Sequence, residues 1–351
     1  MSDPLLIYGA TGYTGALIVH EALRQGLRPV LGGRNAAKLA PMAQLLGLDY
    51  RAARLADAHA LDVALSDIDV VLHAAGPFSE TARPMVEACL RTRTHYLDIT
   101  GEAAVIEALA DRNAEAHRQR VMIMPAVGFD VVPSDCLSAH VAKRLPGAER
   151  LSIGVRGMEL VTRGSTRTFA EHAGRGILVR RAGAITSVPA GSLQRAFDYG
   201  DGLRPGVSVT WGDVVTAYYT TGIPNIEVYF ESTPLFRVAE TVNRYAGWML
   251  GTAAWQVWLK MHADLLPEGP TEAQRAGVKM VIVAEAEDAR GRRVCSRLHT
   301  PQAYTFTGTT APAIARRVLQ GDVECGFQTP ARVYGADFVL TLPEVRREDV
   351  A

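Results

Sequence analysis

The stretch YGATGYTG, from Tyr8 to Gly15, lies between an apolar run and a helix-like segment, ALIVHEALRQ. Its three glycines match the turn with which a strand–helix unit binds a dinucleotide. In such a turn Gly9 makes the tight bend, Gly12 lets the backbone approach a pyrophosphate, and Gly15 lets helix and strand pack closely. The helix N-terminus adds free N–H groups and a partial positive charge. The stretch therefore predicts a phosphate cradle, with an unliganded strand–helix turn as the alternative.

A second apolar run ends about 20 residues later at GGRN, Gly32 to Asn35. Proteins that bind NAD usually place Asp or Glu at this point, whereas an Arg accommodates the 2′-phosphate of NADP. This chain has Arg34 and no acidic residue within reach, and Lys38 follows one helical turn later. An arginine can fork two N–H bonds onto a phosphate and stack on adenine. The pattern predicts NADP(H) rather than NAD(H); a solvated arginine at a strand end is the alternative.

The first 125 residues or so alternate short apolar runs with amphipathic stretches. We expect strands at 5–8, 29–33, 70–75, 94–99 and 121–126, and helices at about 15–25, 35–46, 81–92 and 102–118. Strands that are apolar throughout and separated by helices are typical of a parallel sheet covered on both faces. The pattern predicts an α/β fold with a doubly wound, Rossmann-type sheet that binds ligands at the carboxyl ends of its strands.

After about residue 150, strand-like runs dominate, which predicts a second α+β domain on a mixed or antiparallel sheet. The expected strands are 151–157, 208–220, 227–232, 278–288 and 294–300, with helices near 166–180, 235–263 and 311–322 and a polar tail, 342–351, that frays. We expect an NADP(H)-binding Rossmann domain over 1–130 and a substrate or oligomerisation domain over 131–351. The helix at about 311–322 is a candidate for packing back on the first domain.

Composition narrows the class of protein. Among 351 residues, 37 Lys and Arg balance 37 Asp and Glu, so no net charge favours nucleic acid or an anionic membrane. The four cysteines lack CxxC or metal-ligand spacing, which predicts no metal site and favours reduced thiols in a cytoplasmic protein. No signal peptide or membrane-spanning segment is evident. The aromatic segment 245–261 has four open interpretations: core, dimer face, substrate entrance or peripheral membrane contact.

Several other mechanisms lack their residues. Short-chain reductases use a Tyr and a Lys four residues apart, and none of the 11 tyrosines is followed by Lys at that spacing. The sequence also lacks a GxSxG elbow, an HExxH zinc motif and a P-loop. Hydrolase and kinase functions are therefore disfavoured.

Taken together, the motifs resemble the saccharopine dehydrogenase-like oxidoreductases, and in particular the branch that includes the trans-acting enoyl reductases. The matching segments run through almost the whole chain: 9–15, 31–35 with Lys38, 74–89, 95–102, 125–135, 162–171, 211–226 and 326–338. True saccharopine enzymes differ in the second domain, so the resemblance does not imply lysine metabolism.

The resemblance implies that three more loops hold the cofactor: 75–78 beneath the pyrophosphate and nicotinamide ribose, and 98–102 and 125–130 beside the nicotinamide. Gly76 would permit close backbone approach, and Pro77 would stiffen the turn. Phe78 would stack on the cofactor, and a helix cap is the alternative role for Thr100. The predicted cofactor-binding residues are Gly9, Thr11, Gly12, Tyr13, Thr14, Gly15, Gly33, Arg34, Lys38, Ala75, Gly76, Pro77, Phe78, Thr100, Gly101, Gly128 and Phe129.

The catalytic residues are harder to predict, because the cofactor carries the hydride and the protein supplies geometry and a proton. The candidate proton donors are Tyr219, Tyr218, Asp130, Asp135 and His172. The two tyrosines are expected at a strand end, where alternation directs at most one of them toward a cleft; packing in the core or on the surface is the alternative. For the aspartates, the alternative is capping of a helix over 134–145.

The main functional hypothesis is an NADPH-dependent reductase that acts on a polarised C=C bond of an apolar or carrier-linked enoyl substrate. An imine reductase or amino-acid dehydrogenase of the saccharopine type is the alternative within the class. A non-catalytic NADP(H)-binding protein is the alternative from another class. The arginine-rich stretch 163–181 is either a site for a carboxylate or a phosphopantetheine, or a solvated helix face. A homodimer is a further hypothesis.

Overall fold

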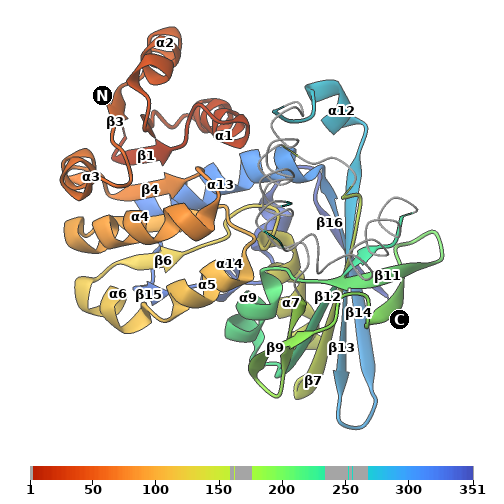
Figure 1. Ribbon diagram of the computed structural model, residues 1–351. Coiled ribbons are helices and arrows are strands. Elements are labelled where there is room, and N and C mark those ends of the chain that lie inside the picture. The colour runs from red at the N-terminus through yellow and green to blue at the C-terminus, as the bar shows by residue number, and fades with distance from the viewer. Residues whose placement is uncertain are drawn as a thin grey trace. The chain divides into compact units, whose positions relative to one another are not determined.

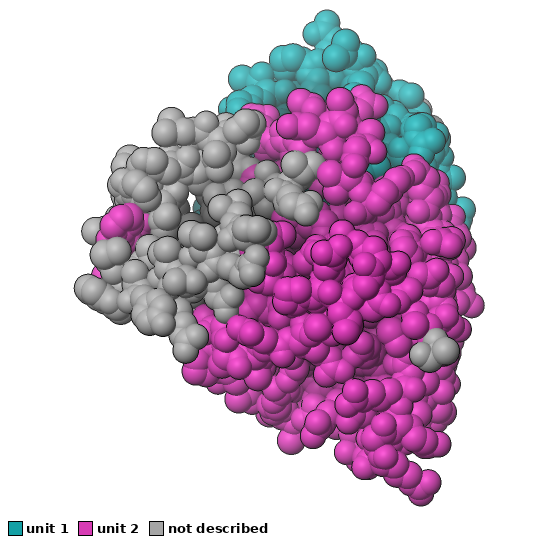
Figure 2. Space-filling view, turned by 90° about the vertical axis from the view of Figure 1, so that its right-hand side faces the viewer, with its two compact units in different colours: residues 1–132, 303–335 teal, residues 133–302, 336–351 magenta. Residues whose placement is uncertain are grey.

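The computed structural model describes residues 3–158, 162, 176–233, 252, 255 and 268–350. The chain divides into two compact units, coloured teal and magenta in Figure 2. Unit 1 comprises residues 1–132 and 303–335, and unit 2 comprises 133–302 and 336–351. His172, most of the arginine-rich stretch and nearly all of segment 245–261 lie outside the described residues. The functional division into cofactor and substrate domains stays a prediction.

Unit 1 is built on a seven-stranded sheet in the order β15-β6-β5-β4-β1-β2-β3, in which every pairing is parallel (Figure 1). Its central strands are fully buried, as their apolar sequences require. The predicted doubly wound sheet is confirmed. Its strands are β1 (Leu5–Tyr8), β2 (Val30–Gly33), β3 (Tyr50–Ala52), β4 (Val70–His73), β5 (His95–Asp98), β6 (Met122–Met124) and β15 (Gly326–Phe327).

Helices cover both faces of this sheet. On one face α1 packs against α13, a helix from the distant part of the chain, with Leu17 lying against Gly308. On the other face α3 packs against α4 beneath β4 and β5. The helices of unit 1 are α1 (Tyr13–Arg24), α2 (Ala36–Leu46), α3 (Ala58–Leu65), α4 (Phe78–Thr92), α5 (Ala103–Ala110), α6 (Asn113–Gln119), α13 (Ala303–Leu319) and α14 (Pro330–Tyr334).

Unit 2 is built on a nine-stranded mixed sheet, which confirms the predicted second α+β architecture. Its main path is β10-β11-β12-β7-β13-β14-β16; off this path, β8 pairs with β12, and β9 pairs with β8. Among the described strand pairs of the unit 2 sheet, only β12–β7 is parallel. The elements are α7 (Val132–Arg144), β7 (Ala148–Arg156), β8 (Ile177–Arg181), β9 (Ala184–Val188), β10 (Gln194–Asp198), β11 (Leu203–Val209), α9 (Asp213–Thr221), β12 (Asn225–Glu231), α12 (Glu272–Ala276), β13 (Lys279–Asp288), β14 (Arg293–Pro301), η1 (Phe338–Thr341) and β16 (Arg346–Val350).

Three sequence expectations in this unit are wrong. The strand expected over 208–220 ends at Val209, and helix α9 follows, stopped by Gly222 in a left-handed conformation. The tail does not fray, because 346–350 pairs with β14 as β16. Residues 177–181 form strand β8 rather than the end of a helix. No helix among the described residues is long and apolar enough to cross a membrane.

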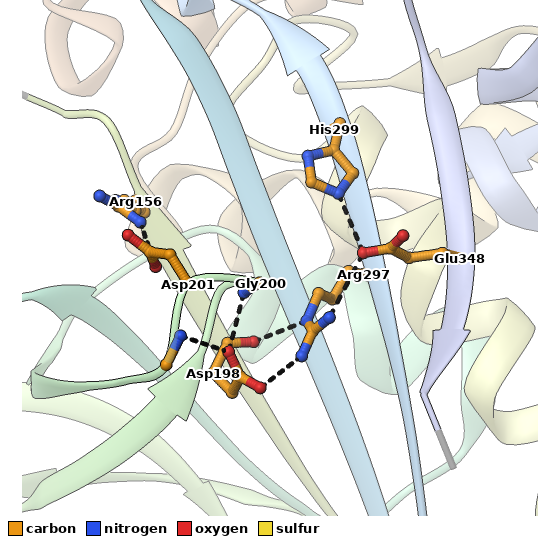
Figure 3. Close-up of polar contacts among 8 residues, drawn as sticks. Arg156, Asp198, Gly200, Asp201, Arg297, His299 and Glu348 are labelled. Carbon is orange, nitrogen blue, oxygen red and sulfur yellow. Dashed lines mark hydrogen bonds and ion pairs between the residues drawn. The ribbon is translucent and has the colours of Figure 1, made fainter.

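A polar network in unit 2 joins strands that are not neighbours in the sheet (Figure 3). Asp198, at the end of β10, accepts hydrogen bonds from the Gly200 N–H (2.8 Å) and from the Arg297 guanidinium (2.6 Å) on β14. Arg297 also contacts Glu348 on β16 (3.4 Å), which in turn contacts His299 (3.2 Å). Because β10 and β14 are not neighbours in the sheet, the bond between Asp198 and Arg297 cross-links two strands that the sheet's own hydrogen bonds do not join.

Candidate functional site

The turn between β1 and α1 has the geometry of a phosphate cradle. Gly9 has φ +91°, and a Cβ there would lie 2.8 Å from the backbone of Ala74 and Ala75. A Cβ on Gly15 would collide with the carbonyl of Gly9, so neither position accepts a side chain. Gly12 is the N-cap of α1, no side chain caps the helix, and its first turn carries no acidic residue. Thr11 and Gly12 are exposed, which leaves this helix end open to an anion.

The end of β2 carries two cations suited to a second phosphate. Arg34 and Lys38 are exposed, and their side chains make no hydrogen bond or ion pair with the rest of the described chain. Asn35 caps α2 by accepting a hydrogen bond from the Ala37 N–H (3.0 Å), so its side chain is occupied. Gly32 rather than Gly33 is the closely packed glycine, since its Cβ would lie 2.6 Å from the Leu6 side chain. The residues present therefore fit the diphosphate and 2′-phosphate of NADP(H).

The loop after β4 is fixed by a carboxylate from the loop after β5. Glu102 accepts hydrogen bonds from the Phe78 N–H (2.9 Å) and the Ser79 N–H (3.0 Å), and so caps α4. Gly76 is exposed, the Gly76–Pro77 peptide is cis, and Thr81 donates to the carbonyl of Ala75 (2.7 Å). The loop thus presents backbone at the carboxyl edge of the sheet.

The ring of Phe78 faces the interior. Only 9% of the residue is exposed, and its ring meets the buried imidazole of His73 edge-on at 5.4 Å. His73 has no hydrogen-bond partner for either ring nitrogen within the described chain, and burial lowers its pKa to about 3. Stacking of Phe78 on a cofactor stays a prediction, and this packing favours contact through its backbone.

The loops after β5 and β6 are joined by buried polar groups. Asp98 accepts hydrogen bonds from the N–H groups of Thr100 (2.9 Å) and Ala126 (2.8 Å) and from the Tyr96 hydroxyl (2.7 Å). The Thr100 hydroxyl accepts from the Glu102 N–H (3.1 Å), so it braces the turn before α5, whose N-cap is Glu102. Thr100 is completely buried. Any contact that it makes with a cofactor stays a prediction.

Asp130 lies at the meeting point of these loops. Its carboxylate sits so close to Gly101 that a Cβ on that glycine would overlap it. Burial, together with the nearby Glu102 carboxylate, raises the pKa of Asp130 to about 7. Asp130 makes no hydrogen bond to another described residue. It is the predicted catalytic residue whose acidity is tuned for proton transfer near neutral pH.

Gly128 and Phe129 pack against α13. A Cβ on Gly128 would lie 2.9 Å from the Thr307 side chain, whose hydroxyl accepts a hydrogen bond from the Phe129 N–H (2.9 Å). The Phe129 ring is buried and meets Phe306 edge-on at 5.9 Å. Tyr13, in the cradle, meets Tyr304 in the same way at 5.5 Å. Helix α13 therefore supports both the cradle and the loop after β6.

The predicted tyrosines belong to a helix of unit 2 and not to a strand end. Because Tyr218 and Tyr219 lie within α9, they are not directed to opposite faces as strand neighbours are. Arg180 stacks over the Tyr218 ring at 4.2 Å. Asp135 is buried in the first turn of α7 and accepts a hydrogen bond from Thr220 (2.5 Å). The catalytic roles of both tyrosines stay predictions.

Sequence reasoning missed two residues that shape the unit 1 site. Asp98 was expected only as part of a loop beside the nicotinamide, yet it joins two loops; an acid at the end of an apolar strand, followed by Thr-Gly, is the signal that could have shown this. Thr307 bonds to Phe129 across 178 positions of sequence, and no local pattern predicts such a contact.

Comparison with known proteins supports this assignment of unit 1. Residues 5–124 match the family described as the saccharopine dehydrogenase NADP binding domain. This match confirms the predicted family resemblance and the predicted cofactor, NADP(H). It covers β1 to β6, which include the cradle, the β2 end and the loops after β4 and β5.

Two curated relatives match a part of the chain. A trans-acting enoyl reductase of Mycobacterium leprae is 36% identical over 139 residues, which cover 37% of this chain and 33% of that protein. A lipid droplet localized protein of Caenorhabditis elegans is 30% identical over 145 residues, covering 37% and 34%. The matches thus span about a third of the length of these relatives.

The fold as a whole is shared with a solved enzyme. The saccharopine dehydrogenase (L-Glu forming) of Saccharomyces cerevisiae aligns over 99% of both chains with a TM-score of 0.65. The sequence identity is 12%, so the likeness establishes the fold and carries no substrate.

Proposed function

We propose that this protein is an NADPH-dependent oxidoreductase that delivers hydride to a polarised C=C bond of an apolar or carrier-linked enoyl substrate. The observation that carries the proposal is the open cradle at α1, together with Arg34 and Lys38, whose side chains have no partner in the described part of the chain. The resemblance to trans-acting enoyl reductases supports C=C over C=N. A small or carrier-bound substrate, a homodimer and a cytoplasmic location are further parts of this proposal.

Different groups of unit 1 would bind different parts of the cofactor. The first turn of α1 would hold the diphosphate through its N–H groups, and Arg34 with Lys38 would hold the 2′-phosphate. Bound NADPH supplies the hydride. The loops 75–78, 98–102 and 125–130 would border the nicotinamide and exclude water from it.

We propose Asp130 as the proton donor in preference to Tyr218 and Tyr219, because its pKa is raised to about 7. After hydride reaches the β-carbon of an enoyl thioester, the electron pair of the C=C bond moves onto the carbonyl. Asp130 then gives its proton to the α-carbon and is reprotonated from water. A carboxyl group with a pKa near 7 is about half protonated at neutral pH and can perform this step.

The cofactor assignment is tested by fluorescence titration with NADPH and NADH. In Arg34→Ala, we expect NADPH to bind about 10- to 100-fold more weakly while NADH binding is unchanged, because a charge-assisted phosphate bond is lost. The matched control is Arg118→Ala, an exposed arginine on α6. Tighter binding of NADH than NADPH by the wild type would refute the assignment.

The bond type is tested with NADPH that carries deuterium at C4. We expect deuterium to enter a conjugated enoyl thioester and not a cyclic imine, and Asp130→Asn to lower this rate at least about 100-fold. A loss of rate in Tyr219→Phe or Tyr218→Phe, with Asp130→Asn active, would move the proton donor to unit 2. Labelling of the imine would favour the saccharopine-type alternative, and labelling of neither acceptor would favour a non-catalytic binding protein.

A further inference from the structure

Asp98 is the one side chain in the described part of unit 1 that bonds to the amides of both loops at the edge of β5 and β6. Its Oδ1 accepts from the N–H groups of Thr100 and Ala126, while its backbone carbonyl accepts from the Val127 N–H (2.7 Å). Its Oδ2 accepts from the Tyr96 hydroxyl. The residue is completely buried, so water does not compete for these bonds.

The loop after β6 needs such an anchor. Ala126 has φ +59°, a left-handed conformation that L-residues other than Asn and Asp rarely adopt. A residue keeps this conformation only where its surroundings hold it. Here consecutive amides, those of Ala126 and Val127, both bond to Asp98. The bend that follows directs the chain toward Asp130.

The same two loops meet again at Asp130. Its carboxylate packs on Gly101, one residue after the Thr100 amide that Asp98 holds. The distance between the loops therefore decides how closely Asp130 approaches Gly101 and Glu102. The cradle and the cations at the β2 end belong to other strands, and none of the hydrogen bonds given above for Asp98 reaches them.

We propose that Asp98 is a positioning residue that sets the spacing of the loops 99–102 and 125–130, and with it the place of Asp130. This inference rests on the proposed function for its effect on turnover. Asp98 touches neither of the phosphate-binding features, which would supply most of the NADPH affinity, so we expect its loss to lower the rate of the chemical step far more than the affinity for NADPH. Misplacement of a reacting group by about 1 Å costs on the order of 100-fold in rate.

The test compares full-length Asp98→Ala, Asp98→Asn and Thr94→Val. We call the hydrogen bonds of the Asp98 carboxylate to Thr100, Ala126 and Tyr96 the Asp98 clamp, and Asp98→Ala removes all three. Asp98→Asn keeps an oxygen that accepts both amides, and its NH₂ group can donate to the Tyr96 oxygen. Thr94, at the opposite end of β5, is equally buried and donates to the carbonyl of Ile68 (3.0 Å), so Thr94→Val is a control for general destabilisation.

Turnover is measured with NADPH and an N-acetylcysteamine enoyl thioester. We expect kcat to fall about 100-fold in Asp98→Ala with the Kd for NADPH within about twofold of wild type, and to recover in Asp98→Asn. Thr94→Val should keep both values. Loosening of the loops hydrates Asp130, the carboxyl that faces Glu102 and shares its loops with Asp98. The fall of kcat with rising pH should therefore move to lower pH in Asp98→Ala.

Hydrogen–deuterium exchange gives a readout that does not need turnover. We expect faster exchange at peptides covering 99–102 and 125–130 in Asp98→Ala, and not in Asp98→Asn or Thr94→Val. Unchanged exchange and kcat in Asp98→Ala, or an equal loss of NADPH binding, would overturn the inference. If the wild type reduces no acceptor, the proposed function fails, and exchange alone decides whether the clamp exists.

Discussion

The two ends of the unit 1 site use opposite means to hold their groups. At β1 and β2, glycines leave the backbone free of side chains, and the charged side chains of Arg34 and Lys38 are exposed without a partner among the described residues. At β5 and β6, carboxylates are withdrawn from water and bonded to backbone amides. Binding of a charged cofactor needs hydrogen-bond donors that are not already bonded to other protein groups. Proton transfer needs a group whose position and acidity are fixed before the ligand arrives.

The largest effect on stability should come from a substitution in the first region, at β1 and β2. Gly9→Ala would force a side chain into a left-handed position and against the backbone of Ala74 and Ala75, so we expect a loss of about 3–5 kcal/mol in unfolding free energy. Gly26→Ala is the matched control, because Gly26 has φ +82° and open space around it; its cost should be about 1 kcal/mol. Urea unfolding of both variants measures the difference, and equal costs would show that the close approach is unimportant.

A smaller effect is expected in the second region, at β5 and β6, where the stability of the protein should depend on the ionisation of Asp130. Because the pKa of Asp130 is raised to about 7, the folded protein holds this proton more tightly than the unfolded chain, where the carboxyl has its ordinary value. Stability attributable to Asp130 is therefore present at low pH and is lost as pH rises from about 4 to 7. Asp130→Asn removes this loss.

We expect Asp130→Asn to unfold at higher urea concentration than wild type at pH 8, by about 1 kcal/mol after allowance for partial exposure, with a smaller advantage at pH 4. The variant should be inactive at both values. Urea titrations at the two pH values provide the measurement. An advantage that shrinks as pH rises would mean that the buried carboxyl is ionised at no cost to the fold.

The smallest effect should come from unit 2, outside both regions. Asp198→Ala removes its ion pair with Arg297 and its bonds to the turn amides of Gly200 and Gly202. We expect a small loss of unfolding free energy that becomes smaller still at high salt, because the carboxylate is exposed and its ion pair is screened. NADPH binding should be unaffected. A fall in NADPH affinity would show that the network influences unit 1.

The sequence allowed the interior of unit 1 to be predicted closely, because a buried parallel strand is apolar on both faces. The run LLIY coincides with β1, and VVLH with β4. The edge strand β3 escaped notice, since Tyr50 and Ala52 are exposed and the strand has three residues. In unit 2 the β-branched and aromatic run VVTAYYT suggested a strand. Tertiary packing overrides this weak preference, and the run forms α9.

Within the candidate site, too, some features could be predicted from local sequence and others could not. Glycine spacing and Arg34 are local signals, and they were sufficient to predict the cradle and the cofactor. The clamp by Asp98 joins positions 28 residues apart, and its geometry follows from strand order, which sequence pattern does not give residue by residue. The strand His95–Asp98 was expected, but the three hydrogen bonds to its last side chain could not be inferred from it.

Residues 303–335 belong to unit 1 although most of unit 2 precedes them in the sequence. This order limits how much of unit 1 can fold during synthesis of the chain. Until α13 has been synthesised, α1 lacks the helix it packs against and the Phe129 amide lacks its acceptor. The cradle end therefore cannot reach its final packing while the nascent chain is shorter than about 320 residues, although its defining glycines leave the ribosome first. A fragment cut at residue 124, the end of the segment that matches the family, would carry every predicted phosphate-binding residue and still expose the apolar face of α1 to aggregation.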